Sequence, residues 1–252
     1  MKNYVIHSQR VGITEAGDPA FNLFLFDHLY RANVIMTKNL TDALIERILK
    51  NRHCIILHLT CTGYGGTAME PNVPTPETMR SQVGKLLNAG FPASQVVLRI
   101  DPIMPTYEGR KIAYTVAALF AGIGISRLRF SVLDMYKHVK ERFIEKDMPI
   151  PYTSFHASER ARLNVYLGLK TIADKYGYVV EACAEPNIPQ TPCVSQKDLD
   201  ILGINDITLK DSAQQRRACG CPANKSELIR NGQPHRCEHQ CLYCFWKDLD
   251  KD

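Results

Sequence analysis

Short runs of β-branched and aliphatic residues alternate along this chain with stretches that have the 3.6-residue period of helices. Parallel strands need long crossover connections, which are usually helical, so this alternation favours a parallel sheet covered by helices. The predicted strands are residues 4–8, 33–38, 54–60, 95–101, 127–134, 178–185 and 206–210. The expected fold class is therefore α/β, a complete or partial parallel (β/α) TIM-like barrel.

Helical patterns lie between several of these strands. In "LTDALIERILK" (residues 40–50) the apolar residues share one face. "PETMRSQVGKLLNAG" (residues 76–90) opens with Pro76, which is favoured in the first turn of a helix, and reaches Gly90, where a helix should stop. Further helices are predicted at residues 110–121 and 156–176. We expect a barrel domain over residues 1–215 and a cysteine-rich, cluster-binding segment over residues 216–252, packed on the barrel.

The composition is that of an ordinary globular protein. The longest apolar stretch, which begins at Ile112, has about fourteen residues, and a membrane helix needs roughly twenty. The first residues contain no apolar signal-peptide region. The nine cysteines are odd in number and unevenly spaced, so a disulfide framework is not expected. The prediction is a cytoplasmic protein with no membrane segment, whose clustered thiols bind metal.

Polar residues occupy alternate positions in four of the predicted strands, and alternate residues of a strand share a face. They are His58 and Thr60; Arg99 and Asp101; Arg127, Arg129 and Ser131; and Glu181, Cys183 and Glu185. Buried charges cost several kcal/mol unless they are paired or solvated. The pattern predicts a polar lumen that holds a ligand. The alternative is a structural network in which Arg99 pairs with Asp101 and Arg129 with Glu181.

Three cysteines close to the end of the sequence form the motif "CEHQCLYC", residues 237–244. Thiolates are soft ligands that select zinc, copper(I) or iron–sulfur clusters. With this spacing, Cys237, Cys241 and Cys244 could ligate three irons of a 4Fe-4S cluster and leave the fourth iron open. The alternative is a closed zinc site, with ligands drawn from this motif and its neighbours Cys219, Cys221, His235 and His239.

The motif, with the aromatic Tyr243 before its last cysteine, resembles the signature of the radical S-adenosylmethionine (SAM) superfamily. "IMTKN", "LHLTCTG", "EPNVPTPETMR", "KLLNAGFP" and "VVLRIDPIMP" resemble, in this order, the barrel of the spore photoproduct lyase and DNA-repair-photolyase-like branch. That likeness spans roughly residues 33 to 106. A closer likeness, over most of the chain, is to an uncharacterised bacterial family with "SVLDMYK", an "EACAE"-like strand and "QRRACGC" before the cysteine triplet.

The position of the motif departs from the superfamily pattern, in which the cysteine loop follows the first barrel strand. A circular permutation of the barrel accounts for this departure, because chain ends often lie close together. The cysteine loop would then still cap the carboxyl ends of the strands, where barrel active sites form.

The resemblance implies an enzyme that cleaves SAM reductively with a 4Fe-4S cluster, producing a 5′-deoxyadenosyl radical that abstracts a substrate hydrogen. It implies an electron donor such as flavodoxin or ferredoxin. By analogy with the lyase branch, the substrate is nucleic acid or a nucleotide, and the net charge of +5 permits this. A non-catalytic iron–sulfur or zinc protein with structural C-terminal cysteines is the alternative.

The resemblance also suggests roles for residues outside the motif. Lys38 aligns with a lysine that contacts SAM, Thr60 falls where a hydroxyl contact to SAM is expected, and Tyr243 could pack beside the adenine. Each could equally be a simple structural residue. Arg99, Arg129 and Glu181 are cofactor-binding candidates in the predicted lumen. Cys61 and Cys183 are the candidate catalytic hydrogen donors, because a thiol can quench a carbon radical, although free cysteines are usually small buried hydrophobes.

Overall fold

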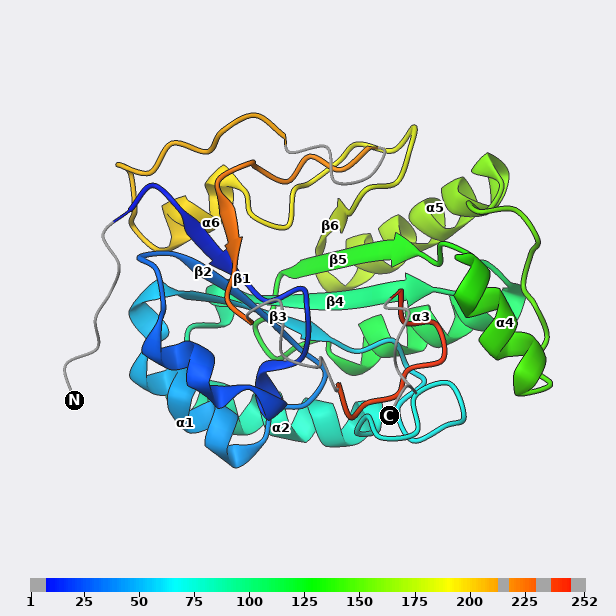
Figure 1. Ribbon diagram of the computed structural model, residues 1–252, viewed down its shortest axis with the longest axis horizontal. Coiled ribbons are helices and arrows are strands. Elements are labelled where there is room, and N and C mark those ends of the chain that lie inside the picture. Colours follow the sequence, from blue (N-terminus) through cyan, green and yellow to red (C-terminus); the bar gives the residue numbers. More distant parts are fainter. Residues whose placement is uncertain (1–7, 213–217, 230–236, 246–252) are drawn as a thin grey trace.

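The fold is built on one parallel sheet. The computed structural model describes residues 8–212, 218–229 and 237–245. Seven strands in these ranges form the sheet, in the order β6-β5-β4-β3-β2-β1-β7, and every neighbouring pair is parallel (Figure 1). The strands are β1 (Val11–Ile13), β2 (Asn33–Thr37), β3 (Ile55–Thr60), β4 (Val96–Ile103), β5 (Arg127–Val132), β6 (Val179–Ala182) and β7 (Lys225–Glu227).

Four of the described α-helices begin at a threonine or serine that caps them. Thr41, Thr75, Thr106 and Ser158 each accept a hydrogen bond from a backbone N–H of the first turn. The α-helices are α1 (Asp42–Lys50), α2 (Pro76–Asn88), α3 (Tyr107–Leu119), α4 (Lys137–Glu145), α5 (Glu159–Tyr176) and α6 (Gln196–Ile201). Short 3-10 helices are η1 (Pro19–Phe21), η2 (Leu23–Asp27), η3 (Arg52–Cys54) and η4 (Ala93–Gln95).

The two faces of the sheet are covered by different parts of the chain. On one face, residues such as Ile35, Leu57 and Leu98 pack against α1 to α5 in a large apolar core. On the other face, Met36 and Val97 belong to a second cluster with α6 and with segments on either side of it. In Figure 1, α1 and α2 lie on the opposite side of the sheet from α6. The polar strand residues on this second face are therefore covered by α6 and by the segments on either side of it.

Most of the predicted elements are confirmed. The predicted strands 33–38, 54–60, 95–101, 127–134 and 178–185 correspond to β2 to β6, and the four predicted helices to α1, α2, α3 and α5, with shifted ends. The strand predicted at 206–210 is wrong. Asp206 pairs instead with Arg31, and Ile207 packs in the second apolar cluster. The strand predicted at 4–8 lies outside the described residues except for Ser8, which is in a bend.

The parallel α/β class is confirmed, and the sheet is open. Its pairings run in a line from β6 to β7, and no pairing joins these two edge strands in the described part of the chain. Strand β7 belongs to residues 216–252, which were expected to pack on the barrel as a cluster-binding segment, so this segment also contributes a strand to the sheet. Among the described residues, no helix combines the length and the apolar character needed to cross a membrane.

Candidate functional site

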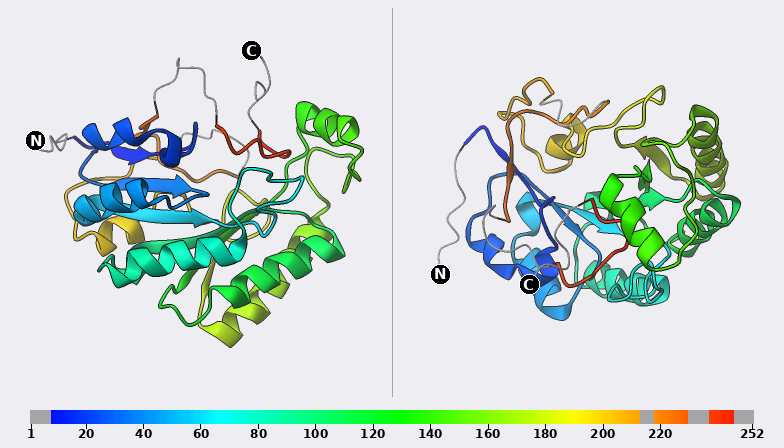
Figure 2. Two further views of the ribbon diagram at one scale, coloured as in Figure 1. Left: turned by 90° about the horizontal axis from the view of Figure 1, so that it is seen from below. Right: turned by 45° about the vertical axis from the view of Figure 1, so that its right-hand side comes forward.

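The cysteine loop, residues 237–245, lies at the carboxyl ends of the strands. It lies between the loop that follows β3, residues 61–75, and helix α4, as Figures 1 and 2 show. Three hydrogen bonds fix its backbone: Leu242 N to Met69 O (3.0 Å), Asn72 Nδ2 to Glu238 O (2.6 Å) and Arg142 Nη1 to Cys244 O (2.6 Å). The three cysteines are therefore held over the edge of the sheet where active sites of parallel α/β proteins form.

The loop after β3 is shaped by glycine. Gly65 forms a parallel bridge with Glu70, and Gly66 N donates to Glu70 O at 3.0 Å. A Cβ atom at Gly65 would lie 1.9 Å from the carbonyl oxygen of Pro74, so no other residue fits this backbone path. The tight fold of the loop brings the Glu70 carboxylate under the cysteine loop.

Glu70 joins the loop to the end of β2. Its carboxylate accepts hydrogen bonds from Lys38 Nζ (2.6 Å), from Thr62 Oγ1 (2.7 Å) and from the Tyr243 hydroxyl. Lys38 Nζ also donates to the Tyr243 hydroxyl at 2.8 Å. Burial would raise the pKa of Glu70, but the charge of Lys38 and the hydrogen bonds from Lys38, Tyr243 and Thr62 together outweigh burial and hold this pKa below its ordinary value. Lys38 and Tyr243, both predicted to contact the cofactor, are thus brought together by a carboxylate that the prediction did not include.

A buried histidine anchors the other end of the loop. His239 is fully buried, with Nε2 2.9 Å from Asp18 Oδ2 and Nδ1 3.1 Å from Asn72 O. The Asp18 carboxylate also accepts from the backbone N–H of Lys38 at 2.7 Å. Both ring nitrogens of His239 are therefore used in docking, which argues against a zinc ligand at this position; His235 lies outside the described residues.

The three cysteines of the loop lie close enough to influence one another. Burial raises the pKa of Cys241 to about 12; Lys38 opposes this effect, whereas Cys244 and Cys237 add to it. Burial likewise raises the pKa of Cys237 to about 12. With the side chains in their present positions, no group of three or more His, Cys, Asp and Glu residues among the described residues could hold a metal ion. The donor set fits a thiolate-ligated cluster in chemistry and location, and binding one requires the sulfurs to turn toward a common centre.

The polar residues of the strands form ion pairs on the second face of the sheet. Arg99 pairs with Asp101 and lies 3.5 Å from Thr60 Oγ1 through Nη1. Glu181 pairs with Arg129, and its Oε1 lies 2.8 Å from Arg127 Nε. These are the pairs that the structural alternative predicted.

Several polar side-chain atoms in this region nevertheless have no hydrogen-bond partner among the described residues. They are both ring nitrogens of His58, of which one is a donor and one an acceptor in the neutral ring, and the donors Nε of Arg99 and Nε and Nη1 of Arg129. His58 and Arg129 are completely buried, and burial, reinforced by Arg129, holds the pKa of His58 well below its ordinary value. A buried donor without a partner costs about 1–3 kcal/mol, so these groups mark a place where a ligand would be stabilised.

The two candidate hydrogen donors lie in different clusters. Cys61 is buried in the large core, where burial raises the pKa of its thiol to about 12. Cys183 is buried in the second cluster, and its sulfur lies 3.5 Å from that of Cys193. Cys219 and Cys221 also belong to this second cluster, whereas Cys241 packs in the large core. This separation argues against a zinc site shared between the two groups.

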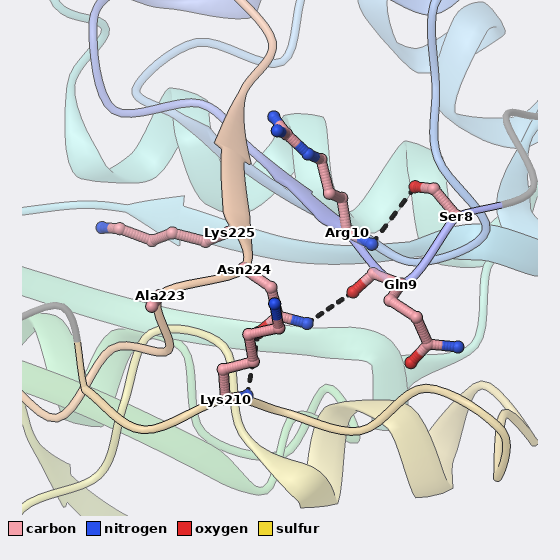
Figure 3. A pocket seen from close by; sticks show the side chains of 7 residues that line it. All are labelled: Ser8, Gln9, Arg10, Lys210, Ala223, Asn224 and Lys225. Carbon is pink, nitrogen blue, oxygen red and sulfur yellow. Dashed lines mark hydrogen bonds between the residues drawn. The ribbon is translucent and has the colours of Figure 1, made fainter.

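A hollow of about 360 Å³ lies at the opposite ends of the strands (Figure 3). Its lining residues include Arg10 just before β1, Lys225 at the start of β7, and Lys210 in the segment that follows α6. Lys225 is paired with Glu15 at 2.6 Å. The hollow is therefore separate from the cysteine loop.

The fold and site define a parallel α/β protein with a three-cysteine loop at the carboxyl ends of its strands. The family model described as "Domain of unknown function (DUF1848)" matches residues 27–246, so the chain belongs to this family. A comparison with curated proteins finds no match.

Replacing Glu70 with glutamine should loosen the cysteine loop. The substitution keeps the shape of the side chain but removes the charge that neutralises Lys38, so we expect docking to weaken by about 1–3 kcal/mol. The reduced, metal-free variant should alkylate at Cys241 roughly 5 to 150 times faster than the wild type, since alkylation of a buried thiol requires local opening. Peptide mass spectrometry after timed alkylation measures this rate.

Glu77→Gln, in the exposed first turn of α2, is the matched control and should not change the rate.

The charge of Glu70 also predicts a pH dependence of the docking of the cysteine loop. Because the folded pKa of Glu70 is below the ordinary 4.5, its contribution is present above about pH 4.5 and is lost as the pH falls through the folded pKa. Glu70→Gln should lack this acid-dependent loss. Equal alkylation rates in wild type and Glu70→Gln would show that Glu70 does not hold the loop.

Proposed function

We propose that this protein is a radical SAM enzyme that binds a 4Fe-4S cluster through Cys237, Cys241 and Cys244. The observation that carries the proposal is the docking of the cysteine loop across the carboxyl ends of the strands, against Lys38 and Glu70. When bound, the cluster and SAM would supply one-electron cleavage of the sulfonium and a 5′-deoxyadenosyl radical that abstracts a substrate hydrogen.

The strand order supports a circularly permuted partial barrel. Strand β7 lies beside β1, so reading across the sheet from its edge gives β7, then β1 to β6 in sequence order. The cysteine loop follows β7 in the chain and therefore follows the first strand in this spatial order. The arrangement keeps the loop next to the barrel mouth although its residues come late in the sequence.

The residues of this chain would bind and orient the cofactor. The ammonium of Lys38 lies beside the loop, with two of its three donors used by Glu70 and Tyr243, and it would offer positive charge to the carboxylate of SAM. Tyr243 is held in place by Glu70 and cannot swing freely. Thr60, the last residue of β3, and Arg99, which pairs with it in β4, lie on the second face and would contact the remainder of SAM or the substrate.

The reductant would be a low-potential donor such as flavodoxin or ferredoxin, and nucleic acid or a nucleotide is the substrate class to test first. The net charge of +5 suits an anionic substrate. Salt-dependent binding of single- and double-stranded oligonucleotides to the cluster-loaded protein would test this class directly.

The central experiment is anaerobic reconstitution of the full chain with iron and sulfide. We expect an electron paramagnetic resonance signal from the reduced cluster that changes when SAM is added, and release of 5′-deoxyadenosine under reducing conditions. A loop that binds only zinc, with no spectral response to SAM and no 5′-deoxyadenosine, would instead support a structural role for the cysteines.

A further inference from the structure

Four cysteines outside the loop gather in the second cluster. Cys183 follows β6, Cys193 precedes α6, and Cys219 and Cys221 precede β7. The sulfurs of Cys183 and Cys193 are 3.5 Å apart, and the Cys221 thiol lies close enough to the thiols of Cys193 and Cys219 to interact with both. The backbone N–H of Cys193 also donates to Cys221 Sγ at 3.3 Å. Three separate segments of the chain thus converge on one group of sulfurs.

The spacing of these sulfurs suits a single metal ion. With zinc–sulfur bonds of about 2.3 Å, tetrahedral coordination places the sulfurs roughly 3.8 Å apart. The 3.5 Å between Cys183 Sγ and Cys193 Sγ is within a few tenths of this separation. The ligands of an iron–sulfur cube bind different irons and stand farther apart, so the close spacing favours a mononuclear ion.

The surroundings provide a second, independent observation. Arg99 and Arg129 interact electrostatically with both Cys183 and Cys193. These are the two arginines whose buried N–H groups have no hydrogen-bond partner among the described residues: Nε of Arg99, and Nε and Nη1 of Arg129. Metal-bound thiolates normally accept hydrogen bonds from such groups in their outer shell. One zinc ion with four thiolates has a net charge of −2, which two neighbouring guanidinium groups would stabilise.

We propose that Cys183, Cys193, Cys219 and Cys221 bind a structural zinc ion, with Arg99 and Arg129 as outer-shell hydrogen-bond donors. The thiols form a chain of contacts in the order Cys183, Cys193, Cys221, Cys219, and in this arrangement these described residues do not enclose a metal-sized centre. Rotation of the cysteine side chains, with loss of the thiol protons to solvent, closes the tetrahedron.

The site has a structural consequence. It joins the segment that follows β6 to the segment that precedes β7, and these are the two edge strands of the open sheet. The bound ion would therefore clamp the covering segment over the second face of the sheet. Cys183, predicted as a hydrogen donor, is on this proposal a metal ligand.

Zinc analysis in a background without the loop cysteines tests the proposal independently of the radical SAM function. In the full chain carrying Cys237→Ala, Cys241→Ala and Cys244→Ala, we expect about one zinc per chain after exhaustive dialysis, measured by inductively coupled plasma mass spectrometry. Adding Cys193→Ser should remove this zinc. Adding Cys54→Ser should not, because Cys54 is a buried cysteine that bonds to Asn51 O away from the cluster.

Cobalt gives a readout that does not depend on folding of the Cys193 variant. Co²⁺ added to the metal-free background protein should produce intense thiolate-to-metal charge-transfer bands and the visible bands of a tetrahedral site. Zinc should displace the cobalt. Absence of zinc and of the tetrahedral cobalt spectrum from the folded background protein would overturn the proposal, as would zinc that persists in the Cys193→Ser protein or a Cys183–Cys193 disulfide in protein purified without oxygen.

Discussion

Replacing Glu181 with leucine should lower the free energy of unfolding by about 3–5 kcal/mol. The Glu181 side chain is 4% exposed and is shared by two buried guanidinium groups, those of Arg127 and Arg129. Removing one partner of a buried ion pair leaves the other charge without compensation in a region of low polarity. Here two arginines are affected at once, and among the described ion pairs Arg127 alone keeps another carboxylate, that of Asp198 at 2.7 Å.

Chemical denaturation of the wild type and the variant under identical metal conditions measures this effect. Glu141→Gln is the control, because Glu141 forms an exposed pair with Lys137 at 3.8 Å within α4. Such pairs contribute about 0–1 kcal/mol. A Glu181→Leu protein less than about 1 kcal/mol below the wild type would indicate that the guanidinium groups are satisfied by another partner, or that water reaches them.

On the proposed function, replacing Cys241 with alanine should abolish both cluster binding and SAM cleavage. Cys241 is the most buried of the three loop cysteines, and it packs in the large apolar core. With two thiolates remaining, the loop lacks the three ligands that hold the cube. Iron and sulfide analysis after reconstitution, together with chromatography of 5′-deoxyadenosine, measures the loss.

Cys54→Ala is the matched control for this experiment. Cys54 is also buried, but it lies in η3 before β3, at the opposite end of the strand from the cysteine loop. This variant should keep its iron and its SAM cleavage, with a stability loss of only about 1 kcal/mol from the small cavity. A Cys241→Ala protein that still formed 5′-deoxyadenosine would exclude the loop as the site of the cluster.

The sequence predicted the central strands well because their pattern is strong. Strands β3, β4 and β5 are six to eight residues long and carry apolar side chains on the helix-covered face. Strands β1 and β7 were missed because each has three residues, and "KSE" in β7 has no apolar member. The segment 206–210 has a local preference for extended structure. It could not have paired with β1, because both edges of β1 are already paired, one with β7 and the other with β2.

Residues of the candidate site could be predicted from the sequence where they belong to a short motif or to a segment that resembles a known family. The cysteine triplet, Lys38 and Tyr243 could be identified in this way, and the structure brings Lys38 and Tyr243 together. Glu70 and Cys193 were missed because their roles depend on distant partners: Glu70 bonds to Tyr243, 173 residues away, and Cys193 bonds to Cys221, 28 residues away. Only the folded chain shows such pairings.

The position of β7 beside β1 has a consequence for biosynthesis. Translation proceeds from the amino terminus, so β1 to β6 leave the ribosome before β7 and the cysteine loop exist. Until then the outer edge of β1 has no neighbour, and an uncovered edge strand can pair with other chains. Any metal delivered to the loop must arrive after all seven strands have been made, so metal loading in the cell would follow the synthesis of the whole sheet.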